Sequence, residues 1–326
     1  MGTPGNDPAG PGQQTATTVV YITGSGRSGS TLLERILGAC PGYVNVGELI
    51  ELFRWVAPED ERCGCGEPFS ACPFWQQVGE IAYGGWTPAL VAEVAALQRQ
   101  VARQRRLPLL LAHPRAGRAF SRDVAAYHDH YERLYAAIAE ASGAQVVVDA
   151  SKWPAQGLAL TRSPRLDVRL LHLVRDVRGV SFSWAKSGVA RPHDAGSRPT
   201  MATHPVARTA ARWAAFQAEA EITRRVARRS AFLRYEDLVA SPATAVARAL
   251  DQLGLDTGTG VLDHVDDTSA DLGTSHGIGG NPSRFRTGRQ QLRLDEEWRR
   301  TMGRRDRWST TLIGLPVLAR YRYLRS

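Results

Sequence analysis

The sequence predicts an α/β fold in which a parallel sheet is flanked by helices. Short apolar runs rich in β-branched residues alternate along the chain with longer segments of helical periodicity. Such alternation is typical of parallel strands joined by helical crossovers. Polar side chains suited to binding an anion follow each apolar run, as expected at the carboxyl edge of a parallel sheet, where ligands bind.

The expected elements follow one another in a regular order. Strands are predicted at residues 17–23, 144–151, 167–176 and 230–238. Helices are predicted at 30–40, 86–106, 118–141, 176–187, 204–229 and 242–253. The polar groups that follow the four strands are Gly24–Thr31, Asp149–Lys152, Arg175–Asp176 and Arg234–Asp237.

The domain organisation is expected to be simple. Residues 1–16 are Gly-, Pro- and polar-rich and predict a disordered tail, and residues 17–326 predict a single domain. Within it, we expect a mainly helical insertion at 50–145, after the first βα unit, and mobile loops at 187–205 and 270–290. No secretory signal is recognisable, and the apolar runs are too short to span a bilayer. We therefore expect a cytoplasmic protein without a transmembrane segment.

The charge balance favours an anionic ligand. The chain has 41 Lys and Arg residues against 32 Asp and Glu, a net charge of +9, and Arg predominates. The guanidinium group offers a planar, bidentate fork to phosphate. Nucleic acid is disfavoured as a partner, because the Arg residues are scattered and no recognisable binding motif accompanies them.

The segment GSGRSGST, residues 24–31, follows the first strand and opens the first helix. Its glycines have the spacing of a Walker A loop, and hence of a P-loop-like fold, but Ser30 stands where that motif has lysine. Backbone N–H groups and the helix N-terminus still bind an anion, and Arg27, Ser28 and Thr31 add donors. A 5′-phosphosulfate fits this loop, because its terminal group carries less charge than a γ-phosphate and needs no metal.

Four segments in order resemble sulfotransferases that use 3′-phosphoadenosine 5′-phosphosulfate (PAPS). GSGRSGSTLLERIL resembles their phosphosulfate loop, and LLHLVRDVRGVSFSW (170–184) resembles their 3′-phosphate segment. FLRYEDLVASP (232–242) and HGIGGNPSRFRTGRQQLRLDEEW (276–298) resemble a later strand and turn and a closing loop. The resemblance is to the bacterial and carbohydrate/tyrosylprotein branch, because VVVDASKWP lacks the K-x-H segment of the aryl branch.

The resemblance implies a PAPS site and a small-molecule or glycan acceptor, with no metal required. Arg175 and Ser183 match the 3′-phosphate segment, in which the serine is expected at the start of a helix. Arg284 and Arg286 lie in the segment that resembles the closing loop. Tyr235 is either near the nucleotide or an ordinary core residue. The expected nucleotide-binding residues are Gly26, Arg27, Ser28, Gly29, Ser30, Thr31, Arg175, Ser183, Tyr235, Arg284 and Arg286.

Sulfuryl transfer needs a base for the acceptor and positive charge at the leaving phosphate. Glu48 is the expected base, with Glu51 as the alternative one helical turn away. Lys152 ends a buried strand and resembles the family lysine that approaches the bridging oxygen, and Arg27 assists. Asp149 either orients Lys152 or caps the turn that follows.

The cysteines favour packing over metal binding. Cys63, Cys65 and Cys72 are clustered, but C-x-C-x₆-C is not a standard zinc pattern and the sequence offers no adjacent fourth ligand. His113 is a candidate fourth ligand only after folding, and a disulfide is disfavoured in the cytoplasm. The preferred interpretation is a compact turn whose aromatic residues pack the insertion against the sheet.

Two other functions remain open at this point. A P-loop small-molecule kinase predicts Mg²⁺ dependence, for which Asp149 is the candidate strand-end carboxylate. A catalytically silent nucleotide-binding module predicts ligand binding without turnover. The acceptor is a natural-product hydroxyl, a sugar or a lipid-linked glycan, and the sequence does not distinguish among them.

Overall fold

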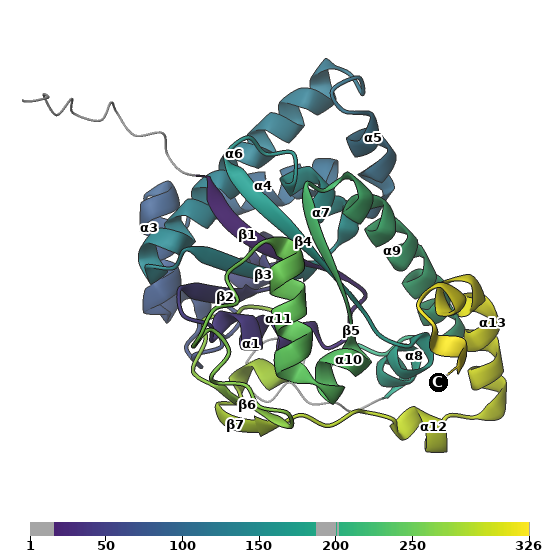
Figure 1. The fold of residues 1–326 in the computed structure, drawn as a ribbon. Coiled ribbons are helices and arrows are strands. Elements are labelled where there is room, and N and C mark those ends of the chain that lie inside the picture. Colours follow the sequence, from purple (N-terminus) through teal and green to yellow (C-terminus); the bar gives the residue numbers. More distant parts are fainter. Residues whose placement is uncertain (1–15, 187–199, 201, 326) are drawn as a thin grey trace, which may run out of the picture.

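The computed structural model describes residues 16–186, 200 and 202–325, and its centre is a five-stranded sheet (Figure 1). The strand order is β2-β3-β1-β4-β5, and every neighbouring pair is parallel. The strands are β1 (Thr17–Gly24), β2 (Tyr43–Gly47), β3 (Val146–Lys152), β4 (Leu166–Val174) and β5 (Arg229–Arg234). The predicted α/β class with a parallel sheet is confirmed.

The two faces of the sheet pack into two different cores. Val20 and Ile22 of β1 contact the core that is covered by α1 (Ser30–Gly38) and α11 (Pro242–Leu253). Val19 and Tyr21 point to the larger core on the opposite face, with α6 (Arg118–Ser142) and α7 (Pro154–Leu160). Burial on both faces explains why β1 reads as a continuous apolar run.

The insertion is mainly helical, as predicted, and it follows β2 rather than the first βα unit directly. Its aromatic side chains, among them Phe53, Trp75 and Tyr131, belong to the larger core. The predicted helix at 86–106 is shorter in the structure, because the α-helical pattern ends at Val101 and a 3₁₀ turn follows. The insertion helices are α2 (Ala57–Glu59), α3 (Pro73–Tyr83), α4 (Pro88–Val101), α5 (Leu107–Ala112) and α6.

The C-terminal part of the chain forms a third packing layer at one end of the sheet (Figure 1). Leu318 of α13 and Trp213 of α9 are buried together there. Its helices are α8 (Val177–Ala185), α9 (Val206–Val226) and α13 (Arg304–Arg320), and α12 (Glu297–Thr301) contacts α8. The short helix α10 (Tyr235–Ala240) instead contacts α11 and β5, and its Leu238 belongs to the core with α1 and α11. A separate antiparallel pair comprises β6 (Ser269–Leu272) and β7 (Gly288–Gln291).

Several elements differ from the sequence prediction, among them β5, β2 and α13. The strand predicted at 230–238 ends at Arg234, and Tyr235 begins the short helix α10. The edge strand β2 was not predicted, because it has five residues and polar Asn45 interrupts its apolar pattern. Helix α13 was not predicted, because Arg residues and Pro316 obscure its periodicity.

Two predicted features fall largely outside the described residues. These are the disordered tail at 1–16 and the mobile loop at 187–205. The second proposed mobile loop, 270–290, contains the β6 terminus, a 3₁₀ turn at Pro282–Phe285 and the start of β7, and its mobility stays a prediction. Among the described helices, none has both the length and the apolar character needed to cross a membrane.

Candidate active site

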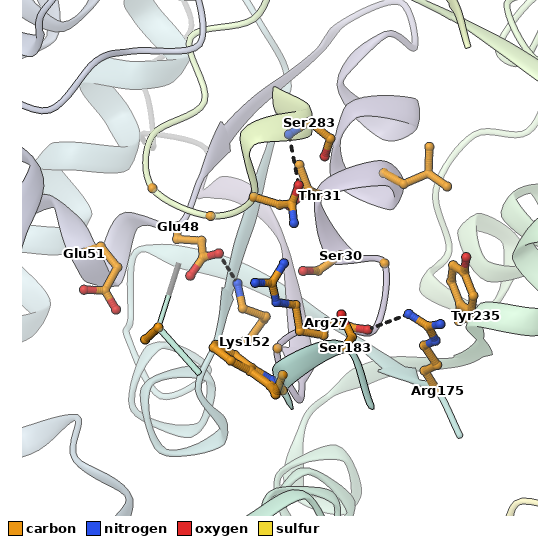
Figure 2. Close-up of a pocket in the computed structure, with 18 of the residues that line it drawn as sticks. Arg27, Ser30, Thr31, Glu48, Glu51, Lys152, Arg175, Ser183, Tyr235 and Ser283 are labelled. Carbon is orange, nitrogen blue, oxygen red and sulfur yellow. Dashed lines mark hydrogen bonds and ion pairs between the residues drawn. The ribbon is translucent and has the colours of Figure 1, made fainter. Parts of the chain in front are cut away.

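A cavity of about 1010 Å³ opens at the carboxyl edge of the sheet. It collects residues from the strand ends, the loop after β2 and the segment before β7 (Figure 2). Ten of the predicted site residues line it: Gly26, Arg27, Gly29, Ser30, Thr31, Glu48, Lys152, Arg175, Ser183 and Tyr235. Residues far apart in the sequence therefore meet in one pocket.

The loop between β1 and α1 is fixed by close backbone contacts. A Cβ on Gly24 would lie 2.2 Å from the Leu173 carbonyl oxygen, so only glycine allows β1 to approach β4 this closely. Gly29 has φ of +87°, and a Cβ there would lie 2.6 Å from the Tyr235 ring. The loop leads into α1, whose first N–H groups have no partner within the helix. It therefore presents backbone donors to an anion.

Arg175 follows β4 and is held from several sides. Its guanidinium donates to the Arg27 carbonyl at 3.1 Å, and to the backbone and carboxylate of Asp295 at 3.0 Å each. It also lies over the Tyr235 ring, 4.6 Å from the centroid. Although burial raises the pKa of Asp295, its hydrogen bond from Arg175 lowers that pKa below the usual value overall. The guanidinium is thus oriented before any ligand arrives.

Ser183 lines the same cavity as Arg175, as predicted, but from a different part of its helix. It lies in the last turn of α8, whereas the sequence interpretation put it at the helix start. The neighbouring Trp184 was missed. Its ring lies 4.9 Å from the Arg27 guanidinium, and a Cβ on Gly26 would approach it to 3.1 Å. Trp184 is therefore an aromatic wall beside the loop.

Glu48 and Lys152 form an ion pair at the other end of the cavity (Figure 2). Their side chains are 16% and 11% exposed, so both are largely shielded from water but reach the pocket. Lys152 Nζ also donates to the Ala150 carbonyl at 3.0 Å. The Lys152 backbone has φ of +70°, a conformation that non-glycine residues adopt rarely and that is concentrated at functional sites.

Glu51 also lines the cavity, one turn beyond Glu48. Burial and the neighbouring Glu48 carboxylate raise the pKa of Glu51 to about 7. Arg54, 3.8 Å away, offsets part of this effect. Two carboxyl groups thus share this end of the pocket, and one of them gains or loses its proton near neutral pH.

Asp149 caps the end of β3 and does not orient Lys152. Its carboxylate accepts hydrogen bonds from the Ser151 backbone N–H at 2.8 Å, from the Ser151 hydroxyl and from Tyr135 at 2.6 Å. It is fully buried and is absent from the residues that line the cavity. Of the two roles open to Asp149, the structure therefore favours capping, and it gives Asp149 no position from which to hold a Mg²⁺ ion in this pocket.

Three expected nucleotide-binding residues do not line the cavity. Ser28 is buried, and its hydroxyl has no hydrogen-bond partner among the described residues. Arg284 is buried and donates to the Arg62 carbonyl at 3.2 Å. Arg286 is exposed, and its carbonyl accepts a hydrogen bond from Arg35. The Arg284 side chain therefore stabilises the fold beside the pocket, and Arg286 contributes its backbone carbonyl.

The glycines of the same segment reach the pocket instead. A Cβ on Gly280 would lie 2.9 Å from Glu48 Oε1, and one on Gly279 would lie 3.3 Å from the Glu48 Cβ. Asn281 and Ser283 line the cavity next to them. The sequence signal was the Gly-Gly pair at 279–280, which lies in the segment expected to be a mobile closing loop.

One protein-family model matches most of the chain. The model of the sulfotransferase family matches residues 20–258. No curated protein matches the chain.

Solved structures similar to the chain are also sulfotransferases. One is the sulfotransferase domain of the Synechococcus PCC 7002 olefin synthase, with 18% identity, coverage of 94% of this chain and 96% of that chain, and a TM-score of 0.49. Another is the sulfotransferase domain of the curacin biosynthetic pathway, with 16% identity, coverage of 93% and 98%, and a TM-score of 0.44. A third is sulfotransferase STF1 of Mycobacterium tuberculosis H37Rv, with 17% identity, coverage of 76% and 70%, and a TM-score of 0.41.

The family match spans β1 to the loop after α11, and so it includes the anion loop, Glu48, Lys152 and Arg175. The narrower resemblance to the carbohydrate and tyrosylprotein branch stays a prediction. The chain belongs to the sulfotransferase family.

Proposed function

We propose that the protein transfers a sulfuryl group from PAPS to a hydroxyl or amine of a small-molecule, sugar or lipid-linked acceptor. One observation carries the proposal: the Glu48–Lys152 pair shares a cavity with an anion loop that lacks the Walker lysine. Membership of the sulfotransferase family supplies the reaction class.

The donor fits the cavity by charge. The loop N–H groups and Arg27 suit the 5′-phosphosulfate, and Arg175 with Ser183 suits the 3′-phosphate. Arg175 donates hydrogen bonds to the Arg27 carbonyl and to Asp295. A guanidinium group has five N–H donors, so others are left to bind a phosphate. Tyr235, which packs against both Gly29 and Arg175, fits the wall between these two phosphate sites.

The proposed reaction is a direct displacement at sulfur. Glu48 takes the acceptor proton while the acceptor oxygen or nitrogen forms a bond to sulfur. The bond between sulfur and the bridging oxygen breaks, and its electron pair stays on the 5′-phosphate. Lys152 and Arg27 neutralise the charge that develops there. The products are the sulfated acceptor and 3′,5′-ADP.

The Glu48–Lys152 ion pair places the proposed base and the proposed cation side by side before the donor binds. When the bridging oxygen gains negative charge, Lys152 has a second anionic partner within the same pocket. As Glu48 takes up the acceptor proton, it no longer attracts the Lys152 ammonium group. That group can then shift toward the leaving phosphate.

The test is a thermal-shift experiment with three nucleotides. The protein is heated with 3′,5′-ADP, ATP or ATP with Mg²⁺, in buffer without added metal or chelator for the first two. We expect a large rise in melting temperature with 3′,5′-ADP alone, by mass-action stabilisation. A rise only with ATP and Mg²⁺ would favour a kinase and overturn the proposal.

A turnover assay then separates an enzyme from a silent binding module. Radiolabelled PAPS is incubated with a mixture of hydroxyl and amine acceptors, and formation of 3′,5′-ADP and labelled product is followed. We expect 3′,5′-ADP to form at a rate above that of the heat-treated protein. Binding of 3′,5′-ADP without any release from PAPS would support the silent module.

A further inference from the structure

Three cysteines of the insertion meet a histidine from a distant loop. In the part of the chain that the structure describes, the Sγ atoms of Cys63, Cys65 and Cys72 and a ring nitrogen of His276 all lie within 4.8 Å of one another. We call these four residues the Cys₃His cluster. His113, the fourth ligand considered from the sequence, instead packs edge-on against Phe120.

Three of the six distances among the ligand atoms match the edges of a tetrahedron around a zinc ion. With Zn–S bonds of about 2.3 Å and Zn–N bonds of about 2.0–2.1 Å, ligand atoms should lie about 3.5–3.8 Å apart. The structure gives 3.7 Å from Cys65 Sγ to Cys72 Sγ, and 3.6 Å and 3.4 Å from His276 Nδ1 to Cys63 and Cys72. A disulfide would need about 2.05 Å, so the sulfurs are spaced for a shared ion.

The backbone around Cys63 and Cys65 is a tight turn of the kind that presents two thiolates to one ion. Arg62 and Pro68 form an isolated antiparallel bridge at its base. The Cys63 N–H donates to the Glu67 carbonyl at 2.8 Å, and the Gly66 N–H donates to the Cys63 carbonyl at 2.8 Å. Cys72 then stands at the N-terminus of α3 and brings the third thiol to this turn.

His276 is oriented by two aromatic residues that follow Cys72 in the chain. Trp75 Nε1 donates to the His276 carbonyl at 2.9 Å. The Phe74 ring stacks on the imidazole, with centroids 4.8 Å apart and an interplanar angle of 18°. These contacts direct Nδ1 toward the sulfurs, so the aromatic residues do more than pack the insertion against the sheet.

We propose that Cys63, Cys65, Cys72 and His276 bind one structural zinc ion. Three thiolates and an imidazole are a Cys₃His set, which fills all four tetrahedral positions. Such a closed site leaves no open position for a reacting water, and soft thiolate ligands select zinc over magnesium or calcium. The sequence predicted a packing turn without metal. We revise that expectation because the structure places His276 beside the three cysteines.

The zinc would join two regions that the chain separates by more than two hundred residues. The Gly64 N–H donates to the Gly277 carbonyl at 2.9 Å, next to the cluster. Ile278, two residues beyond His276, forms a parallel bridge with Gly47 and accepts a hydrogen bond from the Glu48 N–H at 2.8 Å. The ion would therefore hold Gly279 and Gly280 against Glu48.

The first test is the metal content of the full chain, purified without chelator. Elemental analysis should find about one zinc per chain. Cys65→Ser and His276→Ala should each lose most of it, because a three-ligand remainder binds zinc far more weakly. Cys40→Ser is the matched control, since Cys40 is buried at the end of α1, outside the cluster, and should retain one zinc.

The second test does not depend on whether these variants fold. Wild-type protein is stripped of metal and titrated with Co²⁺. Tetrahedral thiolate coordination should give intense visible d–d bands and thiolate-to-cobalt charge-transfer bands, and Zn²⁺ should abolish both. Zinc removal should also lower the melting temperature, because metal-binding free energy contributes to folding.

These readouts are independent of the sulfotransferase proposal, because they need neither donor nor acceptor. The inference would be overturned if the purified protein contained no zinc, gave no thiolate–cobalt bands with Co²⁺ and had the same melting temperature with and without Zn²⁺. Peptide mapping that finds a Cys65–Cys72 disulfide would also overturn it, as would zinc that persists equally in Cys65→Ser and His276→Ala.

Discussion

The two ends of the cavity differ in how they are built. The end proposed to bind the donor phosphates, called the phosphate end, comes from the loops and helices that directly follow β1, β4 and β5. Its lining residues are Gly26, Arg27, Gly29, Ser30, Thr31, Arg175, Ser183 and Tyr235. The transfer end, comprising Glu48, Glu51, Lys152, Gly279 and Gly280, combines three segments that are far apart in the chain. The first end depends on local motifs, and the second depends on tertiary packing.

The charges of the two ends differ as well. At the phosphate end, Arg175 is already fixed by a backbone carbonyl and by Asp295. At the transfer end, the carboxylate of Glu48 and the ammonium of Lys152 neutralise each other, and Glu51 changes charge near neutral pH. If the proposed function is correct, affinity for the nucleotide and the rate of transfer should be separable by mutation.

The largest effect should come from Glu48→Gln, which keeps the shape of the side chain but removes the base. General-base loss typically lowers a rate by about 10²–10⁴. Affinity for 3′,5′-ADP should stay within about threefold, under roughly 0.7 kcal/mol, because the phosphate end is untouched. Turnover and calorimetry on the same preparation measure both quantities.

Glu51→Gln is the matched control for that experiment. It changes a neighbouring carboxyl group of the same cavity and should reduce turnover only a few-fold. A collapse in Glu51→Gln with near wild-type turnover in Glu48→Gln would move the base to Glu51. If neither variant loses activity, the proposed transfer end is wrong.

The second largest effect should come from Arg175→Ala, which should weaken the binding of 3′,5′-ADP. It removes charge-assisted hydrogen bonds worth about 1.5–3 kcal/mol, which is roughly 10–150-fold in affinity for 3′,5′-ADP. Adenosine 5′-phosphosulfate lacks the 3′-phosphate, so its affinity should fall much less. Equal losses for both ligands in calorimetry would remove Arg175 from its proposed contact.

The residues that line the phosphate end could largely be predicted from the sequence, because each of its three segments directly follows a predicted strand. A strand, a glycine loop and a helix specify the anion site locally, and Arg175 follows its strand directly. Ser183 lines the same cavity as Arg175, but it lies in the last turn of its helix rather than at the start. Trp184 and Asp295 were missed, because single aromatic and acidic residues in loops or helix ends carry no pattern.

The transfer end could be predicted only in part. Glu48 and Lys152 were identified through the family resemblance, but their ion pair depends on β2 and β3 being neighbours, and β2 was not predicted. The approach of Gly280 to Glu48 depends on the bridge between Ile278 and Gly47. The spacing of residues in the sequence does not indicate such tertiary contacts. It likewise did not indicate that His276 lies beside the three cysteines.

Gly280→Ala should reduce turnover by about tenfold, since small misplacements near reacting groups are costly. The added Cβ would lie 2.9 Å from Glu48 Oε1 and displace the carboxylate. Affinity for 3′,5′-ADP should not change. Gly288→Ala is the matched control, because Gly288 has the same φ of +76° with nothing within 4 Å of the added Cβ. An equal loss of activity in both variants would show that backbone strain, rather than contact with Glu48, is responsible.

The smallest effect should be a pH-dependent step in turnover. Because burial and Glu48 raise the pKa of Glu51 to about 7, Glu51 is mostly neutral at pH 6 and mostly ionised at pH 8. At pH 8 the ionised Glu51 therefore adds negative charge next to Glu48 and favours movement of the acceptor proton toward this end of the cavity. Arg54 and Lys152 lower the pKa of Glu51, and Glu61 raises it. We therefore expect the rate to rise a few-fold as the pH increases through 7.

Glu51→Gln should abolish this step, because a neutral amide stands at position 51 at every pH. Glu140→Gln is a suitable control, since Glu140 is exposed on α6 and does not line the cavity. A step that persists unchanged in Glu51→Gln must come from another group. The size of the loss distinguishes two roles for Glu51: a few-fold loss fits a carboxyl group that tunes Glu48, whereas a loss of about 10² or more fits the base itself.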